Sequence, residues 1–153
     1  MSDRSVTHAT FVIERTYPAD RGRVFKAWAD PRAKALWFGG PDGDEQLDLD
    51  FRVGGKETSR GTVNGSEFRY EATYHDIVDD ERIVYAYDMY MDGTRISVSL
   101  GTVELSADGG GTRLVYTEKG AYLDGHDTPA QRQEGTEQLF DALGESLKAP
   151  AGT

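Results

Sequence analysis

Cysteine is absent from the chain of 153 residues. Its absence excludes disulfides, thiolate metal sites and cysteine nucleophiles, and it is typical of proteins that fold in a reducing cytoplasm. No apolar run approaches the ~20 residues that a membrane-spanning helix needs. The first ten residues also have no apolar segment of the kind found in secretion signals. We therefore expect a cytoplasmic protein that does not enter a membrane.

Positively charged residues are fewer than negatively charged ones. The chain has 17 Lys and Arg residues and 27 Asp and Glu residues, which gives a net charge of −10. Nucleic acids and anionic membrane surfaces attract clustered Lys and Arg, so we expect neither as a partner. Hydrophobic residues make up 37% of the chain and charged residues 29%, which is typical of a folded globular protein. The length suits a single domain over residues 1–153, with an ordered core at about residues 8–148.

Motifs for metals, nucleotides and nucleophilic catalysis are also missing. The three histidines, His8, His75 and His126, are far apart in the sequence and have no metal-binding spacing. The acidic stretch at residues 42–48 lacks the central glycine and terminal glutamate of a calcium loop, and we interpret it as a solvated loop. No Walker, Rossmann or Gly-x-Ser-x-Gly sequence occurs. We therefore expect no metal and no cofactor.

Alternation of apolar and polar residues, the pattern of half-buried strands, recurs through most of the chain. It predicts about six or seven strands, at residues 8–17, 46–53, 57–63, 67–77, 83–91, 96–105 and 113–119. In the second of these, Phe51 and Val53 belong to the apolar face. Asn64-Gly65 and Asp92-Gly93 predict type I′ hairpins, because both central positions of that turn need a positive φ. Hairpins make the sheet antiparallel.

Two short helices are predicted after the first strand. Asp20 can cap the first, in which Val24, Phe25 and Trp28 share one face, so Trp28 is expected in the core. Asp30 followed by proline starts a second helix that runs to about residue 38 and stops at two glycines, residues 39–40. Of the adjacent aromatics Trp37 and Phe38, we expect one to face away and one to line the mouth of a cavity.

A long helix is predicted at the C-terminal end of the chain. Thr128, the proline that follows it and Gln131 form the sequence of a capping box. The apolar positions then recur at helical spacing, at Thr136, Leu139, Phe140, Leu143 and Leu147. We therefore predict an α+β fold in which a curved antiparallel sheet packs against this helix, with room left between them.

Five of the eight tyrosines fall within residues 68–91: Tyr70, Tyr74, Tyr85, Tyr87 and Tyr90. A dry core favours Phe, Leu or Val, because a buried tyrosine hydroxyl needs a hydrogen-bond partner. Strand alternation places Tyr70 and Tyr74 on one face of their strand. It places Tyr85 and Tyr87 together on one face of the following strand. Three interpretations are open: a core wall, a cavity lining whose hydroxyls orient a ligand, or an exposed dimerisation face.

Two acidic residues are candidates for catalysis. Glu118 shares the apolar face of its strand with Leu114 and Tyr116, where burial would raise its pKa and suit acid–base chemistry. Asp88 lies between tyrosines in its predicted strand. For both residues the alternative is structural, since a carboxylate at a strand end can reach water or pair with an arginine.

Several segments resemble one known family. They are residues 18–31 followed by 36–39, residues 50–55, residues 76–85 and residues 109–114. In this order they resemble the activators of the heat-shock-protein-90 ATPase, part of the START/birch-pollen-allergen superfamily (SRPBCC), over about residues 8–147. The resemblance implies a helix-grip fold with a cavity between sheet and long helix. Relatives often carry Gly-Trp in the last helix, where this chain has Gly135-Thr136.

The resemblance leaves three functions open, because this superfamily includes hydrophobic-ligand carriers, polyketide cyclases and chaperone-binding domains. The first is binding of a small apolar or aromatic molecule by a monomer or homodimer. The second is a cyclase-like or hydrolase-like enzyme that uses Glu118 or Asp88 with a tyrosine or arginine. The third is a chaperone-interaction domain. The expected ligand-binding residues are Trp37, Phe38, Phe51, Tyr70, Tyr74, Tyr85, Tyr87, Tyr116, Phe140 and Leu143.

Overall fold

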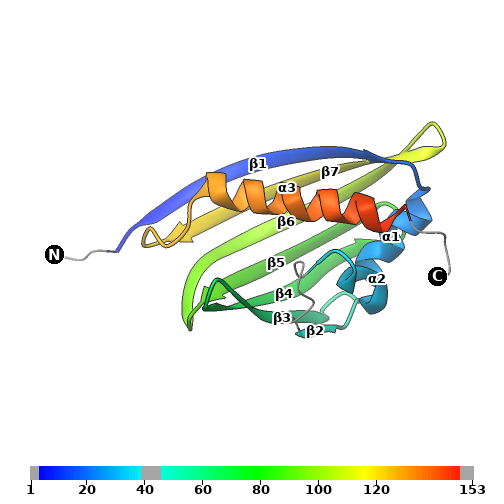
Figure 1. Cartoon of the computed structure of the whole chain (residues 1–153). Coiled ribbons are helices and arrows are strands. Elements are labelled where there is room, and N and C mark those ends of the chain that lie inside the picture. The colour runs from blue at the N-terminus through cyan, green and yellow to red at the C-terminus, as the bar shows by residue number, and fades with distance from the viewer. Residues whose placement is uncertain (1–3, 39–45, 149–153) are drawn as a thin grey trace.

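The computed structural model describes residues 4–38 and 46–148. Within these residues seven strands form one antiparallel sheet, in the order β1-β7-β6-β5-β4-β3-β2. The elements in chain order are β1 (Val6–Tyr17), α1 (Arg21–Ala29), α2 (Pro31–Ala35), β2 (Gln46–Leu49), β3 (Lys56–Val63), β4 (Ser66–Val78), β5 (Arg82–Met91), β6 (Thr94–Asp108), β7 (Gly111–Leu123) and α3 (Pro129–Ser146). Helix α3 crosses one face of the curved sheet, and α1 and α2 lie near its C-terminal end (Figure 1). The predicted α+β helix-grip fold is confirmed.

Both predicted hairpin turns have the type I′ backbone. Asn64 and Gly65 have φ values of 52° and 83°, and Asp92 and Gly93 have φ values of 50° and 81°. This twist matches that of the flanking strands, so each turn fixes the register of its hairpin. The register shifts at two bulges, between Tyr74 and Asp76 in the β4–β5 pair and between Met89 and Tyr90 in the β5–β6 pair.

The helix caps are those that the sequence predicts, with one correction. Asp20 caps α1 by accepting from the backbone N of Arg23, and Thr128 caps α3 by accepting from the backbone N of Gln131. The predicted capping box is wrong in one of its two hydrogen bonds, the one from the backbone N of Thr128 to the side chain of Gln131. The backbone N of Thr128 donates to Oδ1 of Asp127 at 2.8 Å, so Asp127 supplies the bond that we expected from Gln131.

The strand predicted at residues 46–53 ends at Leu49. The backbone N of Arg52 donates to Asp50 O and that of Gly55 to Arg52 O, so the chain bends sharply. Glycine is required at position 55, because a Cβ there would lie 2.1 Å from Asp50 O. Val53 is consequently exposed, and Phe51 packs against rings of the core instead of continuing a strand.

The solid core lies beneath the C-terminal half of α3. Five apolar side chains there have no exposed surface at all, namely Val24, Ile83, Val103, Leu114 and Leu143. The hydroxyl of Tyr17, at the end of β1, donates to Phe140 O at 2.9 Å and fixes the helix on the sheet. Helix α2 ends at Ala35, earlier than predicted, whereas the predicted stop at residues 39–40 and most of the acidic loop at 42–48 lie outside the described residues.

The structure also bears on metals and membranes. Within residues 4–38 and 46–148, no three His, Cys, Asp or Glu side chains gather as a metal site would require. His75 is exposed at a bulge of β4. None of the described helices is both long and apolar enough to cross a membrane.

Candidate functional site

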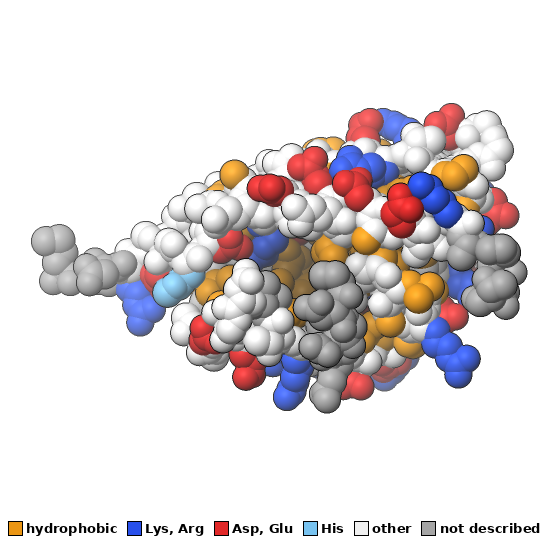
Figure 2. All heavy atoms as spheres, in the orientation of Figure 1, with side chains coloured by type: hydrophobic (Ala, Val, Ile, Leu, Met, Phe, Trp, Pro, Cys, Tyr) orange, Lys and Arg blue, Asp and Glu red, His pale blue; other side chains and the backbone are white. Residues whose placement is uncertain are grey.

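A cavity of about 320 Å³ lies beneath the N-terminal half of α3, between that helix, α1, the segment after α2 and the inner face of the sheet. Figure 2 shows apolar side chains in a recess below the helix. Ligand pockets span roughly 300–1,000 Å³, so this one suits a small molecule. Its lining residues are Trp28, Trp37, Phe38, Ser59, Phe68, Tyr70, Tyr85, Tyr87, Met89, Tyr116, Glu118, Asp127, Gln131, Arg132, Gly135, Thr136, Leu139 and Phe140.

Most residues expected to bind a ligand lie in this wall, and their role in binding stays a prediction. They are Trp37, Phe38, Tyr70, Tyr85, Tyr87, Tyr116 and Phe140. The other three are absent from the wall. Phe51 packs against Phe25 at a ring distance of 5.6 Å, Tyr74 bonds to Glu57, and Leu143 belongs to the solid core.

The two tryptophans are placed differently from expectation. Trp28 is buried as predicted but also forms part of the cavity wall, with its ring 4.8 Å from that of Trp37. Trp37 and Phe38 both reach the cavity, so neither of these neighbours faces away. Trp37 is held by its Nε1, which donates to Ala27 O at 2.9 Å.

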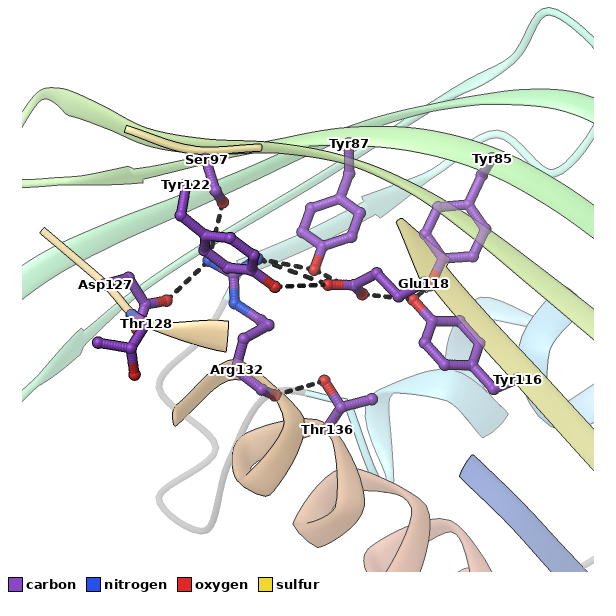
Figure 3. Close-up of polar contacts among 10 residues, drawn as sticks. All are labelled: Tyr85, Tyr87, Ser97, Tyr116, Glu118, Tyr122, Asp127, Thr128, Arg132 and Thr136. Carbon is purple, nitrogen blue, oxygen red and sulfur yellow. Dashed lines mark hydrogen bonds and ion pairs between the residues drawn. The ribbon is translucent and has the colours of Figure 1, made fainter. Parts of the chain in front are cut away.

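Glu118 is the central polar residue of the cavity. It lies on the inner face of β7, its side chain is only 1% exposed, and three tyrosine hydroxyls donate to it. Tyr116 donates to Oε1 at 2.6 Å, Tyr87 donates to Oε1 at 2.9 Å, and Tyr122 donates to Oε2 at 3.5 Å. Figure 3 shows these side chains converging on the carboxylate. The structural alternative therefore fails in the part where the carboxylate reaches water, whereas its other part, pairing with an arginine, is met by Arg132 at 3.9 Å.

Arg132, in the first turn of α3, completes this polar cluster. Its Nη1 donates to the Tyr87 hydroxyl at 2.9 Å, and its Nη2 donates to Ser97 Oγ at 2.8 Å and Asp127 Oδ2 at 2.9 Å. Nη1 is 3.9 Å from Glu118 Oε2. We did not predict Arg132, although its spacing of four residues before Thr136 places it on the inner face of the helix. Below, "the polar cluster" means Glu118, Arg132 and the groups bonded to them.

Burial controls the protonation of the polar cluster. It raises the pKa of Glu118, while the hydrogen bond from Tyr116 and the charge of Arg132 act in the opposite direction. Burial likewise raises the pKa values of Tyr87 and Tyr116 well above the usual value. The tyrosines therefore remain hydroxyl donors, and burial favours the protonated form of the Glu118 carboxyl group.

Asp88 lies on the opposite face of the sheet. Its neighbours along β5, Tyr87 and Met89, line the cavity, so strand alternation turns Asp88 outward. Its carboxylate is 3.1 Å from Arg95 Nε in a partly exposed ion pair. The structure thus separates the two catalytic candidates, with Glu118 inside the cavity and Asp88 outside it.

A second buried ion pair lies behind the cavity wall, and sequence reasoning missed it. Lys34 Nζ donates to Glu57 Oε1 at 2.6 Å, and the hydroxyl of Tyr74 donates to the same oxygen. The Lys34 and Glu57 side chains are 1% and 0% exposed. Burial lowers the pKa of Lys34, and the charge of Glu57 opposes that shift. The pair ties α2, which precedes Trp37 and Phe38, to β3.

Comparison with known proteins agrees with this architecture. A protein from Rhizobium leguminosarum is similar with a TM-score of 0.90 and 44% identity, over 95% of this chain and 97% of that one. Protein Mll3558 from Rhizobium loti is similar with a TM-score of 0.86 and 48% identity, over 93% of this chain and 99% of that one. DynU16, from the dynemicin biosynthetic locus, shares the fold with a TM-score of 0.68 and 19% identity, over 92% of this chain and 47% of that one.

No curated protein is significantly similar to the chain. A family model does match, over residues 18–148, and it describes the activator of Hsp90 ATPase homolog 1-like proteins. The match covers most of the sheet, both short helices and α3, which are the elements that enclose the cavity. The chain therefore belongs to the family of activator of Hsp90 ATPase homolog 1-like proteins.

Proposed function

We propose that the protein binds a small, uncharged aromatic molecule in the cavity beneath α3. The observation that supports this most is the cavity itself, which has a volume of about 320 Å³, aromatic rings on most of its wall and the polar cluster at one end. Apolar burial would supply the affinity, and the polar cluster would orient the ligand.

The expected affinity is moderate. A ring system as large as a tryptophan side chain buries about 250 Å², which corresponds to about 6 kcal/mol at 25 cal/mol per Å². The lost freedom of the ligand and the desolvation of its polar groups reduce this gain. Hydrogen bonds to the polar cluster add to it, so we expect dissociation constants in the micromolar range.

Charges in the polar cluster favour a neutral ligand. Two carboxylates, Glu118 and Asp127, accompany the single cation Arg132. Both terminal nitrogens of Arg132 already donate to protein groups, so little is left to neutralise an anion. Glu118 Oε2 has only long contacts, at 3.5 Å to Tyr122 and 3.9 Å to Arg132, and could accept a hydrogen bond from a ligand hydroxyl.

Calorimetric titration with 2-naphthol and with 2-naphthoate tests this function. The two probes share one ring system, and only the second is anionic at neutral pH. We expect saturable binding of 2-naphthol and at least tenfold weaker binding of 2-naphthoate, a difference of about 1.4 kcal/mol. Both tryptophans of the chain line the cavity, so their fluorescence gives an independent signal of occupancy. Lack of saturable 2-naphthol binding, or tighter binding of 2-naphthoate, contradicts the proposal.

A second candidate function is acid–base catalysis by Glu118. The supporting observation is a carboxyl group of raised pKa that faces a cavity and is flanked by two tyrosine hydroxyls. Such a group can remove a proton next to the carbonyl of a bound aromatic ketone, as cyclisation and isomerisation require. DynU16, which shares the fold, comes from a biosynthetic locus, and that setting is compatible with such chemistry.

Proton exchange tests the catalytic candidate. In D₂O the protein should accelerate loss of the α-proton signals of 2-tetralone, followed by NMR, and Glu118→Gln should abolish the acceleration while 2-naphthol still binds. Asp88→Asn is the matched control, because Asp88 lies on the outer face of the sheet. Equal exchange with wild-type protein and with Glu118→Gln would leave binding as the only supported function.

A further inference from the structure

Two polar atoms in the cavity wall have no hydrogen-bond partner in the described part of the chain. They are Nε1 of Trp28 and Oγ of Ser59, whose residues are 2% and 1% exposed. Buried polar groups almost always have a partner, since leaving one unpaired is costly. The neighbouring Trp37 follows this rule by donating to Ala27 O. Trp28 and Ser59 are exceptions, and both belong to the wall of a cavity.

Both residues lie beside the Lys34–Glu57 pair. Ser59 follows Glu57 by two residues on β3, so the two side chains share the inner face. The Trp28 ring centroid is 5.4 Å from Lys34 Nζ, which itself is 2.6 Å from Glu57 Oε1. Trp28 and Ser59 therefore border the same buried ion pair, Trp28 on its lysine side and Ser59 on its glutamate side.

This region is separate from the polar cluster. Glu118 belongs to β7, and the strands β6, β5 and β4 lie between β7 and β3 in the sheet. Arg132 is in the first turn of α3, whereas the ring of Trp28 packs against Phe140, two turns further along that helix. The cavity therefore has polar atoms in two places, and the strands β4 and β5, which carry Tyr70 and Tyr85, lie between them.

We propose that Trp28 Nε1 and Ser59 Oγ form a second polar subsite, which binds a neutral acceptor oxygen of the ligand. The indole N–H can only donate, and the serine hydroxyl can also donate, so the group they take is an ether, carbonyl or hydroxyl oxygen. The adjacent Lys34–Glu57 pair carries no net charge, and its cation already donates to Glu57, so nothing on this side of the wall neutralises an anionic oxygen. This inference rests on the proposed binding function and narrows its ligand to an aromatic molecule with an oxygen at each end.

Matched probes isolate the contribution of the second oxygen. We compare 6-methoxy-2-naphthol with 6-ethyl-2-naphthol, and 4′-methoxybiphenyl-4-ol with 4′-ethylbiphenyl-4-ol, by calorimetry. Within each pair the shape is nearly the same, and only the methoxy compound carries a second acceptor. With the naphthalene ring, the biphenyl ring or both, the methoxy probe should bind wild-type protein about 3- to 10-fold more tightly than the matching ethyl probe. This is the difference expected for one buried hydrogen bond.

Ser59→Ala should reduce this ratio to about one- to twofold. Trp28→Phe, which removes the N–H and keeps a ring, should reduce it in the same way. Ser99→Ala is the matched control: Ser99 is buried on the same sheet and its Oγ also has no partner among the described residues, but it does not line the cavity. The ratio should be unchanged in this variant. The unliganded Ser59→Ala protein should melt at or above the wild-type temperature, because no hydrogen bond is lost.

The outcomes separate this inference from the proposed function. If none of the four probes binds, the binding function itself is wrong. If they bind and the methoxy-to-ethyl ratio is near one with both rings, or is unchanged by Ser59→Ala and Trp28→Phe, only the second subsite is wrong. A lowered melting temperature of unliganded Ser59→Ala would show that the hydroxyl has a structural partner, which also overturns the subsite.

Discussion

Arg132 and Glu118 are connected through a hydroxyl that both of them contact. Arg132 Nη1 donates to the oxygen of Tyr87, and the same hydroxyl donates to Glu118 Oε1, each at 2.9 Å. The direct distance from Arg132 Nη1 to Glu118 Oε2 is longer, at 3.9 Å. The three residues come from α3, β5 and β7, so the polar cluster forms only when the helix lies correctly on the sheet.

Replacing Glu118 by glutamine should change how stability depends on pH. Burial raises the pKa of Glu118 in the folded protein above its unfolded value of about 4.3. As pH rises, the folded state therefore stays protonated at Glu118 to a higher pH than the unfolded state does. The stabilisation from Glu118 is complete below the unfolded pKa and is lost as pH rises through the folded pKa. The urea midpoint of wild type minus that of Glu118→Gln should fall as pH rises from about 4. If the difference between the two urea midpoints does not change with pH, the pKa of Glu118 is not raised in the folded protein.

Removing the hydroxyl of Tyr116 should raise the pKa of Glu118 further. Its bond to Oε1 is the leading influence that lowers this pKa. Tyr116→Phe should also cost about 1.5–3 kcal/mol of stability where Glu118 is ionised, because the lost bond is to a charged group. The carboxyl carbon of Glu118, followed by NMR against pH, measures the change. Tyr122→Phe, which removes a contact at 3.5 Å, should give a smaller shift, and the reverse order would show that the cluster is placed incorrectly.

The Lys34–Glu57 pair should show strong energetic coupling. Lys34→Met leaves Glu57 buried without its cation and should cost about 3–5 kcal/mol in urea unfolding. Glu57→Gln should have a similar cost, and the double variant should cost clearly less than the sum of the two. Lys148→Met is a control, since the Lys148–Glu145 pair is exposed on both sides and contributes little. Additive single and double effects would contradict a buried pair.

Thr136→Trp should block the cavity. Thr136 lines the cavity from the inner face of α3. An indole there would take up ligand volume, so affinity for 2-naphthol should fall at least tenfold, about 1.4 kcal/mol, while the protein stays folded. Thr136→Val keeps the size of the side chain and loses only the bond to Arg132 O, and it should bind 2-naphthol like wild type. Unchanged binding by Thr136→Trp would place the ligand elsewhere.

Features that depend on neighbouring residues could be predicted from the sequence. Asn64-Gly65 needs no tertiary contact to favour its turn, and the Asp20 and Thr128 caps bond within their own helices. Alternation placed Glu118 on the inner face, because a strand turns successive side chains to opposite faces. These local signals were sufficient for the antiparallel sheet, the three helices and much of the aromatic wall.

Features that depend on distant residues could not be predicted in this way. Lys34 meets Glu57 only because α2 folds over β3, and a lysine in a short polar helix gives no sign of being buried. Arg132 has the right helical spacing, but its four partners come from β5, β6, β7 and the loop before α3. Phe51 left the expected face because the bend at Gly55 ended the strand early.

The place of β1 in the sheet also has a consequence for how the chain folds. β1 pairs with β7 from Tyr17 opposite Thr112 to Val6 opposite Leu123. Among the described strands, β1 therefore pairs only with β7, which is the last strand of the sheet to be synthesised. Closing so large a loop is entropically costly and slows folding. We therefore expect the local hairpins from β3 to β7 to form before β1 pairs with β7.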